Sequence, residues 1–167
     1  MRKLKQAIGI NAPKKAVWDV MADFGSAADW APGMRRSALF GKATTGVGMH
    51  RIMQHAWGFI IEEIITHWTE GEEYSFDLAR APFPMRDVRE KWVLSEDGSQ
   101  TSLDITVSYD MRLGLIGALL DNVLVRFVVA REMRLGIYGL KHHVEKLSAE
   151  SLPDTDLGSA IPERSTN

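Results

Sequence analysis

The sequence predicts a single α+β domain with one opening strand, two short helices, about six consecutive antiparallel strands and a long C-terminal helix. Two patterns indicate this class. Apolar and polar residues alternate through most of 34–112, and apolar residues recur every three or four positions through 118–147. The length of 167 residues and the hydrophobic content of 45% suit one domain with a sizeable core and are too small for two.

The opening strand and the short helices are expected within residues 3–33. KLKQAIGI alternates apolar and polar residues, which is typical of a strand. The next segment, 11–24, carries apolar residues at helical spacing. GSAADWAPG then predicts a second short helix or turn, which Pro32 and Gly33 end.

Turn residues divide 34–112 into six strands. The breaks fall at 41–46, near 56–57, and at 70–71, 81–84 and 97–98. The strongest hairpin signal is Asp97-Gly98, which pairs Trp92 with Leu103 and Glu90 with Ile105. Glu90 is therefore expected on the apolar face of the sheet.

A turn at Glu70-Gly71 would pair Glu63 with Leu78 and His67 with Tyr74, so that Glu63 and His67 also share the apolar face. Burying a carboxylate without a partner costs several kcal/mol, which is about the whole stability margin of a small domain. A hydrated ligand cavity is therefore a better explanation of these residues than a dry core.

The turn near Ala56-Trp57 is the weakest of the set. Taken literally, it places His50 opposite Glu63 on the inner face and Arg51 opposite Glu62 on the outer face. A slip of one residue would exchange the two faces, because side chains alternate along a strand.

The long helix, 118–147, would be about 45 Å long and could cross the whole sheet. Gly136 and Gly139 are unfavourable within a helix, so they predict a close approach of the helix to the sheet, with a simple kink as the alternative. The remaining residues, 148–167, lack periodicity and are expected to form a flexible tail outside a domain of residues 1–147.

Composition excludes several function classes. The net charge is -2 and the basic residues are scattered, so nucleic acid is not an expected partner. The absence of cysteine excludes disulfides, thiolate nucleophiles and Cys-ligated metals, and no metal-ligand spacing or cofactor motif is found. The most apolar window, 113–130, contains Asp121, Asn122 and Arg126, which disfavour a membrane span. No secretory signal is recognised, so a cytoplasmic protein of unspecified oligomeric state is expected.

The element order and several segments resemble the SRPBCC or START-like superfamily. These segments are INAPKKAVWDVMADFGSAADWAPG, GVGMHR, GFIIEEIITHWTEGEEYSFDL, KWVLSEDGSQTSLDITVSYDM and the glycine-bearing last helix. The chain is most similar to the polyketide cyclase/dehydratase-type branch, which is related in fold to Bet v 1 allergens and lipid-transfer START domains. The resemblance covers about residues 3–147 and indicates the fold more than the activity, because the family has no universal catalytic motif.

The resemblance implies a helix-grip fold. In such a fold a curved, seven-stranded antiparallel sheet wraps around the C-terminal helix and leaves a deep cavity between them. The mouth of the cavity would be framed by Trp30, Pro32, Met34 and the segment APFPMR (81–86).

The first functional hypothesis is the binding of a small hydrophobic molecule, such as a polyketide, an aromatic compound or a lipid, in this cavity. For each apolar residue, plain core packing is the alternative. The candidate ligand-binding residues are Trp30, Phe59, Ile61, Ile65, Phe76, Leu78, Arg86, Trp92, Ile105, Val107, Tyr109, Met111, Leu120, Val123, Leu124 and Phe127.

The second hypothesis is a cofactor-independent cyclase or dehydratase. His50 opposite Glu63 is the one plausible acid/base pair, because Glu63 and His67 are about 13 Å apart along their strand. Glu90 is the third candidate catalytic group, and Tyr109 would orient the substrate. The alternative for each is a polar residue of the cavity wall.

Two further interpretations remain open. Glu90, Arg86 and Tyr109 form a cluster that would hold the polar end of a ligand or would be an internal ion pair. A third function, a protein-interaction module, would use exposed apolar loops around Met34 and Phe83.

Overall fold

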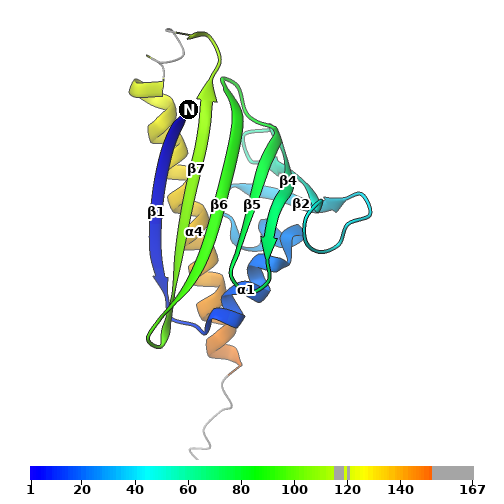
Figure 1. Ribbon diagram of the computed structural model, residues 1–167, viewed down its shortest axis with the longest axis vertical. Helices are drawn as coiled ribbons and strands as arrows, with labels where there is room; N and C mark the ends of the chain where they lie inside the picture. Colours follow the sequence, from blue (N-terminus) through cyan, green and yellow to red (C-terminus); the bar gives the residue numbers. More distant parts are fainter. Residues whose placement is uncertain (115–118, 120, 152–167) are drawn as a thin grey trace, which may run out of the picture.

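The computed structural model describes residues 1–114, 119 and 121–151. Its seven strands form one antiparallel sheet (Figure 1). Their spatial order is β1-β7-β6-β5-β4-β3-β2. Their bounds are β1 Arg2–Ile10, β2 Met34–Phe40, β3 His50–His55, β4 Ile60–Thr69, β5 Glu73–Arg80, β6 Met85–Asp97 and β7 Gln100–Met111. The six consecutive strands expected in 34–112 are confirmed, because β1 alone joins from outside that range and pairs with β7.

Three short helical elements connect β1 to β2: α1 (Lys14–Ala22), the 3-10 turn η1 (Phe24–Ser26) and α2 (Ala27–Trp30). The long helix α4 (Arg126–Glu150) follows the π-helical turn η2 (Asp121–Val125) and runs along one face of the sheet in Figure 1. The predicted α+β class and the helix-grip arrangement are confirmed. No helix among the described residues is long and apolar enough to cross a membrane.

The core lies between the sheet and the helices. Every second residue along much of β6 and β7 is buried on the face toward α4, and polar residues occupy much of the other face. From the helix side, α4 buries Met133, Ile137, Leu140 and Val144 at spacings of three or four residues. Its nearest neighbours are β1, α1 and α2, so the helix packs on one side of the curved sheet.

The start of the long helix differs from the prediction. The apolar stripe runs back from Met133 through Val129 to Val125, whereas Val123 and Phe127 are 68% and 64% exposed. The turn η2 is π-helical and contains one more residue than an α-helical turn. The predicted apolar stripe assumed regular α-helical spacing through this turn, so it falls on the exposed side of the helix. At the other end α4 continues to Glu150, three residues beyond the predicted end.

The prediction for the two helix glycines was half right. A Cβ atom on Gly139 would meet the carbonyl oxygen of Trp30 and would lie 2.6 Å from Cδ of Pro32, whereas nothing lies within 4 Å of one on Gly136. The close approach is therefore made at Gly139, and its partner is the end of α2 rather than the sheet.

The β6–β7 hairpin is displaced by two residues from the predicted register. The turn residues are Gly98 and Ser99, so Glu90 pairs with Val107 instead of Ile105. Gly98 adopts a φ of 62°, which is the left-handed region that the turn requires. A shift of two keeps each side chain on its face, and Glu90 remains on the inner face as predicted.

The β4–β5 hairpin confirms one predicted pair and corrects another. Glu63 pairs with Leu78 as expected. An irregularity between Ile65 and His67 then moves His67 opposite Ser75 instead of Tyr74. His67 lies on the surface, 3.0 Å from Glu73, so its placement on the inner face was wrong.

The β3–β4 hairpin has the register that differs by one residue from the predicted pairing. Arg51 pairs with Glu63, and His50 pairs with Ile64. Arg51 is therefore buried on the inner face, whereas Nε2 of His50 lies 3.8 Å from Glu62 on the outer side. The predicted pair of His50 and Glu63 does not exist, because the chain turns through three residues, 56–58, instead of two. Gly58 has a φ of 89° and closes this loop, since its N–H donates to the carbonyl oxygen of His55.

Candidate ligand site on the inner face of the sheet

A buried ion pair lies on the inner face where β3 meets β4. The guanidinium of Arg51 donates a 2.9 Å hydrogen bond from Nε to Oε2 of Glu63, and its Nη2 donates to the same oxygen. Nη1 donates to the carbonyl oxygen of Phe24 at 2.9 Å, and the guanidinium stacks 3.8 Å above the Phe24 ring. This geometry combines a charge-assisted hydrogen bond with a cation–π contact.

Glu63 is almost fully buried, and this burial raises its pKa, while the charge and the hydrogen bonds of Arg51 act in the opposite direction. Each of the three guanidinium nitrogens of Arg51 donates a hydrogen bond within the protein. Through these contacts Arg51 connects β3, β4 and the segment after α1.

Glu90 is the second carboxyl group on this face. It lies on β6 opposite Phe76 of β5, and it accepts a hydrogen bond of 3.1 Å from Nε1 of Trp92. Burial raises the pKa of Glu90 to about 7, and the negative charge of Glu63 adds to the rise. At neutral pH this carboxyl group is therefore a mixture of proton donor and proton acceptor.

The raised pKa of Glu90 predicts a pH-dependent stability. The folded state keeps the proton between pH 4.5 and about 7, where the unfolded state loses it, so stability falls as pH rises through this range. The variant Glu90→Gln lacks this pH dependence. Its free energy of unfolding, measured relative to that of the wild type, should therefore rise by up to about 3 kcal/mol between pH 5 and pH 8. Urea unfolding across this range measures it.

The control is Glu96→Gln, which removes a carboxylate from the exposed end of the same strand. Identical pH profiles for Glu90→Gln and Glu96→Gln would contradict the assignment of the slope to Glu90.

Aromatic rings surround these carboxyl groups. Tyr74 is 1% exposed, and burial raises the pKa of its hydroxyl, which stays neutral. Its ring lies 5.9 Å from that of Trp92, and the Trp92 ring lies 6.1 Å from that of Trp30. The indole Nε1 of Trp30 is buried without a hydrogen-bond partner among the described residues, which makes it an unused donor on a ring that borders Trp92.

The structure brings most of the predicted ligand-binding residues to the inner face. The buried ones are Trp30, Ile61, Ile65, Phe76, Trp92, Ile105, Val107 and Tyr109. Leu78 and Met111 are partly exposed near the ends of β5 and β7, and Phe59 is partly exposed in the loop just before β4. The exposed side chains of Val123, Leu124 and Phe127 do not pack on the sheet, and Leu120 lies outside the described residues.

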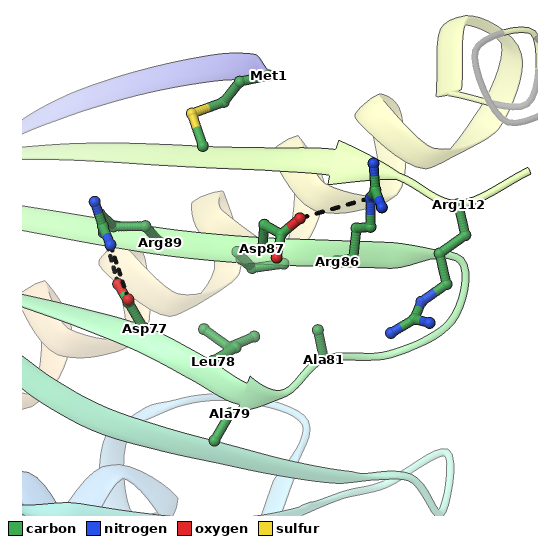
Figure 2. A pocket seen from close by; sticks show the side chains of 10 residues that line it. Met1, Asp77, Leu78, Ala79, Ala81, Arg86, Asp87, Arg89 and Arg112 are labelled. Carbon is green, nitrogen blue, oxygen red and sulfur yellow. Dashed lines mark hydrogen bonds and ion pairs between the residues drawn. The ribbon is translucent and has the colours of Figure 1, made fainter. Parts of the chain in front are cut away.

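Arg86 is also absent from the inner face. It pairs with Asp110 across β6 and β7 and lies 3.6 Å from Asp87, in a hollow of about 340 Å³. The hollow forms because β5–β6 pairing ends at Asp77 and Arg89, which are joined by hydrogen bonds of 2.6 and 2.9 Å (Figure 2). The predicted cluster of Arg86, Glu90 and Tyr109 is therefore not formed.

Arg51 is the main residue that the sequence interpretation missed. The signal was available, because Met49, just before β3, and Met53 lie two positions to either side of Arg51 and are buried as well. His55 was also missed: it is buried, stacks on Phe59 at 4.5 Å and lies 3.7 Å from Glu132 of α4. Among the described residues, no group of three His, Asp or Glu side chains is arranged to hold a metal ion.

Comparison with known proteins decides the family. Residues 1–145 match the family described as "Polyketide cyclase / dehydrase and lipid transport". The chain belongs to this family. Family and fold together indicate hydrophobic ligand binding or polyketide cyclase/dehydrase-type activity. No curated protein matches the sequence.

Solved structures support the same fold. The Zhui aromatase/cyclase from Streptomyces sp. R1128 has a TM-score of 0.71 at 16% identity, over 87% of this chain and 94% of that chain. A START superfamily protein from Mycobacterium smegmatis has a TM-score of 0.71 at 11% identity, over 87% and 98%. A protein from Thermus thermophilus has a TM-score of 0.73 at 17% identity, over 88% and 99%.

Proposed function

We propose that this member of the family binds a small, mostly apolar molecule against the inner face of the sheet, with Glu90 as its polar contact. Apolar side chains such as Phe76, Val107 and Trp92 surround Glu90, and they are themselves buried in the core. Two polar groups, Glu90 and the Nε1 of Trp30, are placed to orient the molecule.

The partial exposure of Glu90 carries the proposal. Its inner-face neighbours along β6, Val88 and Trp92, are buried, and yet Glu90 retains accessible surface in the middle of the sheet. The main contacts of α4 are with β1, α1 and α2 rather than with β6, the strand that carries Glu90. A molecule that enters here would find one carboxyl group in an aromatic surrounding.

The chemistry of Glu90 defines the ligand class. A carboxyl group with a pKa of about 7 donates a hydrogen bond when protonated and accepts one when ionised. The Trp30 indole only donates. The matching ligand is an aromatic, polyketide-like or lipid-like molecule that carries a carbonyl or hydroxyl group.

The test is native mass spectrometry of the purified protein, followed by denaturing extraction and by titration with the fluorescent probe N-phenyl-1-naphthylamine. We expect a co-purifying apolar molecule or saturable probe uptake, with an affinity altered by Glu90→Gln. Arg86→Gln, on the outer side, is the matched control and should leave the affinity unchanged. A ligand-free protein that takes up no probe would overturn the proposal.

A second candidate function, cofactor-independent cyclase or dehydratase activity, is favoured by the same pKa. A general acid or base works best with a pKa near the operating pH, and Glu90 meets this condition. In an enzyme, Glu90→Gln should reduce turnover of the extracted molecule by about 10² or more, whereas in a binder it should change affinity only. His50→Ala should leave turnover unchanged, because His50 lies on the outer side.

A further inference from the structure

Exposed apolar side chains gather at one end of the strands. In an antiparallel sheet the β3–β4 and β5–β6 turns, the start of β1 and the exit from β7 share one end. The start of α4, with the turn η2 and Leu119 before it, lies at the same end (Figure 1). Of 13 large hydrophobic side chains exposed among the described residues, eight belong to these segments. They are Met1, Trp57, Phe83, Leu113, Leu119, Val123, Leu124 and Phe127, and we call this region the apolar end.

The apolar end is also rich in arginine. Arg80, Arg86, Arg112 and Arg126 all lie in these segments, and each keeps its guanidinium within reach of solvent. Three acids also lie there: Glu62 is 3.9 Å from Arg80, Asp87 is 3.6 Å from Arg86, and Asp110 is 2.6 Å from the terminal amino group of Met1. At the opposite end of the strands, the β4–β5 turn carries Glu70 and Glu72, and β6 ends in Glu96 and Asp97, although the last turns of α4 also carry Lys141 and Lys146. The charge of the protein is thus asymmetric, although its net value is only -2.

We propose that the apolar end docks on an anionic lipid surface. Apolar and aromatic side chains on turn tips, such as Trp57 and Phe83, enter the headgroup region, and long arginine side chains reach the lipid phosphates around them. Each basic residue near an anionic surface adds to the attraction. The inference does not depend on whether the inner face takes a ligand.

The charge pattern favours lipid over a second copy of this chain. A twofold dimer through the apolar end would bring the same arginines toward one another across the contact, which is unfavourable. A bilayer containing anionic lipids offers phosphate to all of them at once. It also accepts side chains that project from separate turns, without requiring one flat, continuous protein surface.

The test is co-sedimentation of the full chain with two kinds of vesicle. One kind is pure phosphatidylcholine, and the other contains about one third phosphatidylglycerol to supply negative charge. We expect binding to the anionic vesicles that is at least about tenfold tighter than to the neutral ones and that weakens as salt is added.

Two matched pairs of variants locate the contact. Phe83→Ser should weaken vesicle binding about fivefold or more, whereas Phe40→Ser, a similarly exposed side chain outside the apolar end, should not. Arg126→Gln should weaken it about fivefold, whereas Lys146→Gln near the other end of α4 should not. None of the four side chains belongs to the buried core, so the variants should fold.

Three results would overturn the proposal: no preference for anionic vesicles, equal losses for Phe83→Ser and Phe40→Ser, or sedimentation velocity that shows a dimer broken by Phe83→Ser in a protein that binds no vesicles. A protein partner would also become the better explanation if vesicle binding is absent. Because ligand uptake is measured separately, failure of the docking surface leaves the proposed ligand function standing.

Discussion

Replacing Arg51 by methionine should lower the free energy of unfolding by about 3–5 kcal/mol. The substitution leaves Glu63 buried without its counter-charge and removes the hydrogen bond to the carbonyl oxygen of Phe24. The loss should grow as pH rises, because Arg51 lowers the pKa of Glu63 and its removal lets that pKa rise further. Urea unfolding at pH 5 and pH 8 measures both effects.

Two controls separate the burial of the charge from the mere loss of an arginine. The double variant Arg51→Met, Glu63→Leu removes both charges and should recover much of the stability, because a well-packed apolar pair replaces a buried ion pair at little cost. Arg89→Met removes an exposed arginine that also pairs with a carboxylate, Asp77, and should cost no more than about 1 kcal/mol.

The comparison among these variants decides the interpretation. If Arg51→Met and Arg89→Met lose similar stability, the buried pair has no special role. If the double variant is less stable than Arg51→Met alone, the packing of the two aliphatic stems matters more than the charges. The expected order of stability is wild type near the double variant, with Arg51→Met well below both.

Sequence patterns predicted the fold because its determinants are local. Alternation in 34–112 and three-to-four spacing in the last helix are imposed by burial of one face, whatever the exact partner strand is. The same patterns cannot show where the helix sits on the sheet. That depends on packing between distant segments, such as Gln6 of β1, which donates a hydrogen bond to the carbonyl oxygen of Ala130.

The pairing register of the hairpins limited how well the residues of the site could be predicted from the sequence. Glu63 was placed correctly because its predicted pairing with Leu78 holds, and Glu90 because a shift of two residues keeps a side chain on its face. The shift of one residue in β3–β4 replaced His50 by Arg51 and so changed the chemistry of the inner face from an acid/base pair to an ion pair. The signal for the observed register was Gly58, whose φ of 89° closes a loop of three residues where a two-residue turn was assumed.

The second large expected effect concerns Gly139. Replacing Gly139 by alanine should lower the free energy of unfolding by more than about 2 kcal/mol, because the new Cβ atom would overlap the carbonyl oxygen of Trp30 and lie 2.6 Å from Cδ of Pro32. Neither neighbour is the free end of a flexible side chain, so α4 and the end of α2 must move apart. Thermal unfolding followed by circular dichroism measures the loss.

Gly136 supplies a matched control in the same helix. Nothing lies within 4 Å of a Cβ atom built there, so Gly136→Ala should stabilise the protein by about 0.5–1 kcal/mol through helix propensity alone. Opposite signs for two identical substitutions three residues apart would locate the contact between α4 and α2 at Gly139. Equal signs would mean that the helix adjusts its position at low cost. The inner-face site would then be more adaptable than its geometry suggests, because α2 carries Trp30, whose indole borders Trp92, the hydrogen-bond donor to Glu90.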